Sequence, residues 1–139
     1  MNLRFSFHIF GNFMKFLGLL MFVPAIISLL YKENDIWAFI VSALFTSLFG
    51  FILEKATKPR ERSKEIGRKE GFIIAALAWF GASLFGSIPY LIYGVFNNPV
   101  DAWFESVAGF TTTGATVLIN IEHLPNGMLF WRNFSQWLV

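Results

Sequence analysis

A run of threonines followed by a glycine is the segment of this sequence whose residue types and spacing most suggest chemistry. Thr111, Thr112 and Thr113 precede Gly114, and Ala115 follows it. Consecutive β-branched residues disfavour a helix, and glycine gives the backbone further freedom. An unwound backbone presents carbonyl oxygens that can replace the water around a cation. Because these oxygens carry no net charge, the segment predicts a site for a weakly hydrated monovalent ion.

Three other interpretations of this segment are weaker. Gly109 and Gly114 have the spacing of a phosphate-binding Walker A loop, but Ala115 stands where that motif requires lysine. A threonine nucleophile would need a base, and neither His8 nor His123 is close in sequence. A plain threonine-rich surface loop is the third alternative.

The residues before the threonines predict a short helix that positions them. Asn98 suits the cap of this helix and Pro99 its first position. Residues 100–109 would then rise ~15 Å, half of a ~30 Å hydrocarbon core, so this helix cannot span. We therefore predict a re-entrant half-helix that ends at Gly109 and directs its negative end toward the threonines. Unwound backbone at that depth must line a cavity or lie within protein.

Glu105 is the charge expected inside this half-helix. An intramembrane carboxylate is a candidate functional group by default. It could support the unwound segment by hydrogen bonds to backbone amides or to Arg132, or it could contact a cation directly. Support is the preferred role.

The composition indicates an integral membrane protein. Of the 139 residues, 55% are hydrophobic, 19% aromatic and only 14% charged, and the mean hydropathy is +0.57. Soluble chains carry about 25% charged residues. The balance excludes a soluble enzyme, a disordered chain and a nucleic-acid binder. The sequence contains no cysteine, which excludes disulfides and thiolate metal sites.

Three apolar stretches predict transmembrane helices, at residues 5–31, 36–53 and 71–96. The first contains Lys15, which requires the lysine to snorkel or the span to begin upstream of it. An amphipathic interfacial helix over residues 3–14 is equally compatible, and a cleaved signal peptide is a weaker alternative. Pro24 and Pro89 predict kinks in the first and third spans, and Ala78, Ala82 and Gly86 predict a packing stripe in the third.

Loop charges predict the orientation of these spans. Seven of the eleven Lys and Arg residues lie between Lys55 and Lys69, and such loops stay cytoplasmic. The short turn at residues 32–35 then faces outward, and the amino terminus is cytoplasmic. Binding of anionic lipid is an alternative use of the basic segment.

Residues 101–116 read Asp-Ala-Trp-Phe-Glu-Ser-Val-Ala-Gly-Phe-Thr-Thr-Thr-Gly-Ala-Thr and closely resemble the first pore loop of the TrkH potassium-uptake proteins, in the Trk/Ktr/HKT superfamily. Leu124-Pro125, Phe130-Trp131-Arg132 and Gln136-Trp137-Leu138 resemble the start of that family's next helix. The first two spans resemble its additional amino-terminal pair. The resemblance is strong over residues 101–138 and topological before residue 70.

This resemblance implies four helix–pore-loop–helix repeats that surround one potassium path, each lending filter carbonyls. On matching positions, it implicates Thr112 and Thr113 as the principal K⁺ ligands, then Gly114, with Thr111 and Ala115 at the edges. K⁺ is the transported ion, and no cofactor is expected in this chain. The implied partners are the remaining pore repeats, a second copy in a homodimer, membrane lipid and a TrkA-like cytoplasmic nucleotide-binding regulator. The implied location is the bacterial inner membrane.

We therefore predict an all-α polytopic membrane protein with three transmembrane helices, a re-entrant half-helix with a filter loop, and the start of a fourth helix. Residues 1–54 form an amino-terminal two-helix unit, residues 55–70 a basic cytoplasmic loop, and residues 71–139 an incomplete first repeat. Residues 128–139 would rise only ~18 Å as a helix. The chain is thus expected to be the amino-terminal part of a potassium transporter, inactive alone. The alternatives are a small structural membrane subunit and an oligomeric channel with one pore loop per chain.

Overall fold

The computed structural model describes residues 3–58, 67–113, 115–116 and 124–138. The regular structure of these residues is helical, and none of them forms a strand, as the sequence predicts. The helices are α1 (Leu3–Leu20), α2 (Phe22–Leu30), α3 (Ile36–Ala56), α4 (Arg68–Gly86), α5 (Ile88–Tyr93), α6 (Pro99–Phe110) and α7 (Asn126–Trp137).

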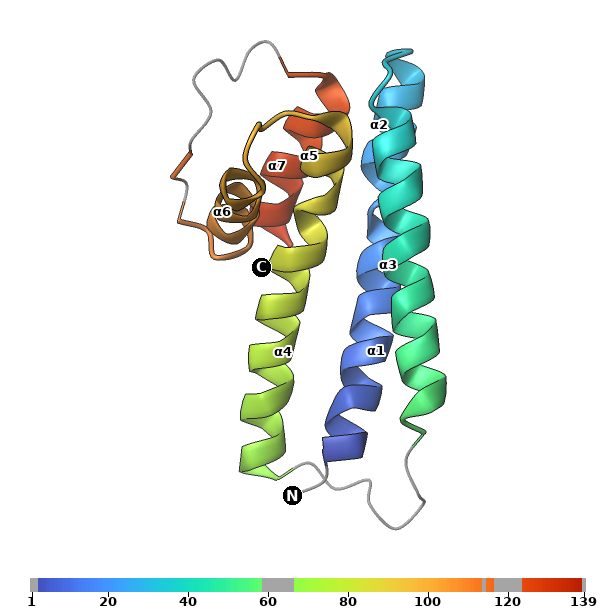
Figure 1. Ribbon diagram of the computed structural model, residues 1–139, viewed down its shortest axis with the longest axis vertical. Coiled ribbons are helices and arrows are strands. Elements are labelled where there is room, and N and C mark those ends of the chain that lie inside the picture. The colour runs from blue at the N-terminus through green and yellow to red at the C-terminus, as the bar shows by residue number, and fades with distance from the viewer. Residues whose placement is uncertain (1–2, 59–66, 114, 117–123, 139) are drawn as a thin grey trace.

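Three of the described helical stretches are long and apolar enough to cross a membrane. α1 with α2 forms Leu3–Leu30, α3 forms Ile36–Ala56, and α4 with α5 forms Arg68–Tyr93. These bounds confirm the three predicted spans to within three residues at each end. In Figure 1, α3 runs opposite to the other two stretches. The chain is a multi-pass membrane protein.

The outer surface of α3 shows why this bundle needs lipid around it. Trp37, Leu44, Leu48 and Ile52 are each more than half exposed. A soluble helix would place polar side chains there, because exposed apolar surface in water is unfavourable. Hydrocarbon tails solvate the same side chains without that cost.

Two spans are interrupted beside a proline, as predicted. The first breaks at Met21, before Pro24, and the third breaks at Ser87, before Pro89. Next to the second break, the carbonyl oxygen of Gly86 accepts a 3.0 Å hydrogen bond from Nε1 of Trp131 in α7. A neighbouring helix thus supplies a donor where the helical ladder is broken, which is how membrane helices tolerate proline.

The amino-terminal stretch resolves a point that the sequence leaves open. α1 begins at Leu3 and passes with a one-residue break into α2, so residues 3–14 belong to the same long stretch and not to a separate interfacial helix. Lys15 does not snorkel alone, because its Nζ forms an ion pair with the Glu54 carboxylate near the end of α3. Glu54 of α3 thus neutralises the charge of Lys15. The two residues are 39 positions apart, so a hydropathy profile cannot reveal their contact.

α1 and α3 touch backbone to backbone at two glycines. A Cβ at Gly50 would lie 2.5 Å from the amide nitrogen of Lys15 and 2.6 Å from the carbonyl oxygen of Gly11. A Cβ at Gly11 would lie 2.9 Å from the carbonyl oxygen of Gly50. Backbone atoms in two rigid helices cannot give way, so this crossing requires glycine on both sides.

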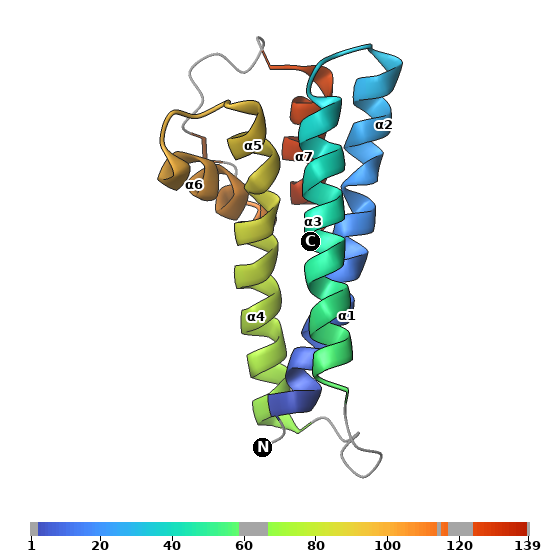
Figure 2. The ribbon, with the colours of Figure 1, turned by 45° about the vertical axis from the view of Figure 1, so that its right-hand side comes forward.

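α6 and α7 lie at the end of the bundle away from the amino terminus, and neither runs its full length (Figures 1 and 2). α6 packs on α4 where the predicted small-residue stripe is buried. A Cβ at Gly86 would lie 2.5 Å from the Phe110 ring and 2.8 Å from Oγ of Ser106. Ala82 is buried too, and with the half-buried Ala78 it lines an apolar cavity of about 270 Å³ between α1 and α4. The stripe is therefore a docking surface over its second half.

The glycine crossing predicts an asymmetry between two alanine substitutions. Gly50→Ala should lower the stability of the folded protein by about 1–3 kcal/mol, since it overpacks a contact between backbones. Gly71→Ala in α4 is the matched control, because a Cβ there meets nothing within 4 Å. Thermal unfolding in detergent measures both. A Gly50→Ala midpoint equal to that of Gly71→Ala would contradict the crossing.

Candidate ion site at the carboxyl end of α6

α6 begins as the sequence predicts. Oδ1 of Asn98 accepts a 3.0 Å hydrogen bond from the amide of Val100, and Pro99 occupies the first helical position. The helix runs over Pro99–Phe110, one residue longer at each end than predicted. Its twelve residues rise ~18 Å, which is too short to span a ~30 Å hydrocarbon core. The helix therefore ends within the half of the bundle that lies away from the amino terminus (Figure 1).

The carboxyl end of α6 closes in a Schellman turn. The amide of Thr113 donates to the carbonyl oxygen of Ala108 at 3.1 Å, and the amide of Thr112 donates to that of Gly109 at 3.1 Å. These two bonds satisfy helix-end carbonyls and turn the chain out of the helix. They place the threonines immediately beyond the negative end of the helix dipole.

Thr112 occupies the position of this turn that normally belongs to glycine. Its φ is +57°, in the left-handed region. That conformation is unusual for any residue with a Cβ and a genuine outlier for a β-branched one. Backbone strain of this kind persists only where the surrounding structure enforces it. The positive φ of Thr112 therefore indicates that the surrounding structure holds the backbone of the threonine segment in this conformation.

The threonine hydroxyls are engaged locally. Oγ1 of Thr111 donates to the carbonyl oxygen of Val107 at 2.6 Å and lies 2.8 Å from Oγ1 of Thr113. No amide among the described residues donates to the carbonyl oxygens of Thr111, Thr112 or Thr113. The hydroxyls of Thr111 and Thr113 are therefore already engaged within this segment.

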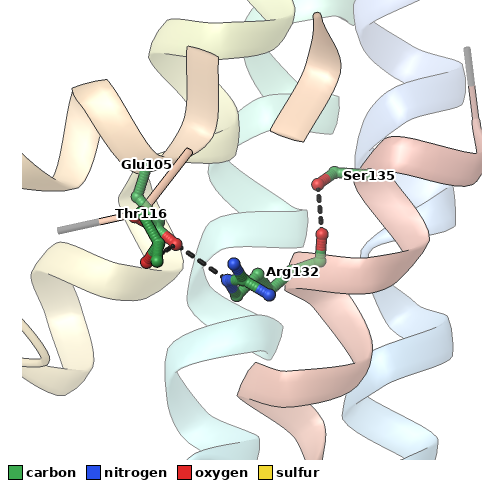
Figure 3. A network of polar contacts seen from close by, with 4 residues as sticks. All are labelled: Glu105, Thr116, Arg132 and Ser135. Atoms are coloured by element: carbon green, nitrogen blue, oxygen red, sulfur yellow. Dashed lines mark hydrogen bonds and ion pairs between the residues drawn. The ribbon is translucent and has the colours of Figure 1, made fainter. Parts of the chain in front are cut away.

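A buried carboxylate ties the segment to its neighbours. Glu105 is 2% exposed, and its Oε1 accepts 2.8 Å hydrogen bonds from Nε of Arg132 and from Oγ1 of Thr116. Figure 3 shows these groups converging from α6, the following segment and α7. The Arg132 side chain is only 13% exposed. The predicted contact between Glu105 and Arg132 is therefore present, and the structure adds Thr116.

Close packing brings α6 and α7 together around this ion pair. A Cβ on Gly109 would overlap Oγ of Ser135, so α7 approaches α6 at a glycine. The Phe110 and Trp131 rings meet edge to face, with centroids 6.0 Å apart. Trp131 is fully buried. Trp131 precedes Arg132 in α7, so this packing holds the helix turn that carries the arginine.

The structure describes most of the predicted site residues. Thr111, Thr112, Thr113 and Ala115 follow α6 and are exposed in this chain, whereas Gly114 lies outside the described residues. His8, the described candidate base, has its Nδ1 3.0 Å from the carbonyl oxygen of Glu54 in the α1–α3 hairpin. The other candidate, His123, is not among the described residues.

Sequence reasoning missed two acidic groups at the amino end of α7. Glu33 bonds to Asn126, and the fully buried Asp35 lies beside Gly127. Both acids sit in the short turn between α2 and α3. Their spacing in the sequence resembles that of any solvated turn, so no local signal identifies them.

Comparisons with known proteins find named transporters among the relatives of this chain. No protein-family model matches it. It is 40% identical over 139 residues to the Trk system potassium uptake protein TrkH of Halomonas elongata, covering 99% of this chain and 28% of that protein. It is 41% identical over 131 residues to an uncharacterised cation transporter of Methanocaldococcus jannaschii, covering 94% and 27% respectively.

A solved structure agrees with the sequence relatives. The crystal structure of the potassium transporter TrkH from Vibrio parahaemolyticus matches with a TM-score of 0.91 and 32% identity, over 99% of this chain and 29% of that one. The chain spans only about 28% of the length of the TrkH relatives it matches, which accords with the prediction of a part of a longer transporter. Over that part, the chain is similar in both sequence and membrane fold to the TrkH potassium uptake proteins.

Proposed function

We propose that this chain contributes one pore loop to a potassium pathway across the membrane. One observation carries the proposal: a half-length helix ends in a strained turn at Thr112, which places the backbone of Thr111, Thr112 and Thr113 at the negative end of the helix. Thr112 and Thr113 are the proposed K⁺ ligands, with Gly114 next and Thr111 and Ala115 at the edges. Support comes from relatives named for potassium uptake and cation transport, which are transporters and not enzymes.

The chemistry of the segment supports a monovalent ion. Neutral carbonyl oxygens replace the hydration shell of K⁺ at little cost, whereas divalent ions favour carboxylates. The buried Glu105 carboxylate already accepts bonds from Arg132 and Thr116, so its geometry fits support of the loop better than direct ion contact. The α6 dipole adds a favourable field for a cation at the turn.

The proposal extends to the assembly around this loop. Residues 71–139 would form one of several repeats around a shared path, with residues 1–54 as an amino-terminal two-helix unit and residues 55–70 as a basic cytoplasmic loop. The positive-inside rule then places the amino terminus in the cytoplasm of a bacterial inner membrane. The expected partners are further pore repeats, a second copy of the protein and a TrkA-like regulator with its own nucleotide site.

Thr112 provides the first test, in a complete transporter that carries these residues. Thr112→Gly should raise the thermal midpoint, because glycine relieves about 1–2 kcal/mol of left-handed strain. The same change should lower the preference for K⁺ over Na⁺, because the carbonyls are no longer confined. Competing K⁺ and Na⁺ fluxes at matched membrane abundance measure this.

Thr112→Val is the matched control for that test. Valine keeps the branched shape, the strain and the carbonyl while it deletes the hydroxyl. Selectivity should therefore change much less than in Thr112→Gly. A loss in Thr112→Val as large as that in Thr112→Gly would move the ligand from the backbone to the side chain.

Glu105 provides the second test. Glu105→Gln should keep much of the potassium uptake, because its described donors Arg132 and Thr116 converge on Oε1, and an amide oxygen can accept these two bonds. Glu105→Ala should lose it, since a buried Arg132 without its partner costs about 3–5 kcal/mol. Uptake in a potassium-uptake-deficient bacterium compares the two. An equal loss in both would show that the charge itself matters.

A further inference from the structure

The turn between α2 and α3 holds the first residue of α7. The Glu33 carboxylate accepts two hydrogen bonds from Asn126: Oε2 from the backbone amide at 2.6 Å, and Oε1 from Nδ2 at 2.9 Å. These partners are 93 positions apart in the sequence. The residue before α7 is Pro125, which makes no side-chain cap bond. The cap of α7 is therefore supplied by another part of the chain.

A carboxylate is well suited to this position. The first amides of a helix have no partner inside the helix, and the helix dipole makes that end positive. Hydrogen bonds to an ionised acceptor are stronger than those between neutral groups. A fork of two bonds also fixes direction, so α7 can neither rotate nor slide without breaking one of them.

Glu33 is itself held in place. The amide of Glu33 donates to the carbonyl oxygen of Ser28 at 3.0 Å, and the amide of Lys32 donates to that of Leu29 at 3.2 Å. Lys32 has a φ of +54°. This is a Schellman turn like that at Thr112, and it fixes the backbone from which the Glu33 side chain projects.

The first turn of α7 is seated tightly on the same turn. A Cβ on Gly127 would overlap Oγ of Ser28 and lie 2.6 Å from Oδ2 of Asp35. Asp35 is fully buried, and burial followed by the negative charge of Glu33 raises the pKa of its carboxyl. The nearby Ser28 hydroxyl and Met128 amide oppose that rise. Asp35 and Glu33 therefore both face the first turn of α7, and the bonds from Asn126 go to Glu33.

α7 connects this contact to the candidate filter. Arg132 lies six residues after Asn126, ~9 Å along one rigid helix. Its Nε bonds to Glu105, which also holds Thr116. A shift of the first turn of α7 would move the guanidinium by a similar amount and stretch bonds that are 2.8 Å long.

We propose that Glu33 is a positioning residue for ion selection, which sets the register of α7 and thereby the placement of Arg132, Glu105 and the filter segment. This role rests on the proposed function of that segment. Apolar packing of Met128 and Trp131 holds α7 against the bundle, and the directional bonds of Glu33 decide where along the bundle it stops. The amino-terminal stretch thus takes part in selectivity without touching the ion.

The test is a rescue cycle in a complete transporter that carries these residues. Glu33→Ala removes the fork, and Asn126→Asp sets two carboxylates against each other. Both should lower the K⁺ over Na⁺ preference about fivefold, the scale of the net contribution of one typical hydrogen bond. Glu33→Gln combined with Asn126→Asp restores a donor and an acceptor and keeps one negative charge. This double variant should return the preference to within about twofold of the parent.

Lys32→Gln is the control, because it changes the charge of the same turn and leaves both bonds to Asn126 in place. Competing K⁺ and Na⁺ fluxes in proteoliposomes, at matched protein content, measure all variants. If Glu33→Ala fails to fold, the comparison of Asn126→Asp with the double variant still decides, because a role in stability alone would leave the selectivity of folded Asn126→Asp unchanged.

The outcomes separate this role from the proposed function. Loss in the single variants with recovery in the double variant supports it. Parental selectivity in Glu33→Ala together with loss in Glu105→Ala overturns it and leaves the proposed function standing. Failure of the double variant to recover what Asn126→Asp loses also overturns it. Parental selectivity in both Glu33→Ala and Glu105→Ala overturns the proposed function and this role together.

Discussion

The ion pair of Glu105 with Arg132 constrains the end of the bundle away from the amino terminus, where α6 and α7 lie. Both side chains are largely buried, and Thr116 bonds to the same carboxylate oxygen as Arg132. A charge left alone in such surroundings is far costlier than one in water, so neither partner can leave without the other. This requirement keeps α6, the segment after it and α7 in one arrangement (Figure 3).

A helix too short to span a membrane needs such anchoring. α6 cannot be stabilised by lipid alone, and it depends on close approach to its neighbours at Gly86 and Gly109. Trp131 completes the contact: its ring meets Phe39 and Phe110 edge to face, and its indole donates to the carbonyl oxygen of Gly86. One side chain therefore packs the core and satisfies a backbone acceptor beside a proline break.

Two helix ends share one unusual solution. α2 and α6 each close in a Schellman turn with a non-glycine residue at positive φ, Lys32 in the first and Thr112 in the second. The first turn projects Glu33 toward α7, and the second leads from α6 into the threonine segment. In both places a strained residue fixes the direction in which the chain leaves the helix.

Hydropathy, helix-capping residues and motif pattern were enough to predict the three spans, the start of α6 at Asn98 and Pro99, and the contact of Glu105 with Arg132. These signals are local or periodic, because hydrocarbon thickness and helix geometry impose them on every membrane chain. The pairing of Lys15 with Glu54, the strained φ of Thr112 and the bond from Asn126 to Glu33 came only from the tertiary structure. Such contacts join distant residues through packing, and nothing in their own sequence neighbourhoods distinguishes a solvated acid from one that caps a helix 93 positions away.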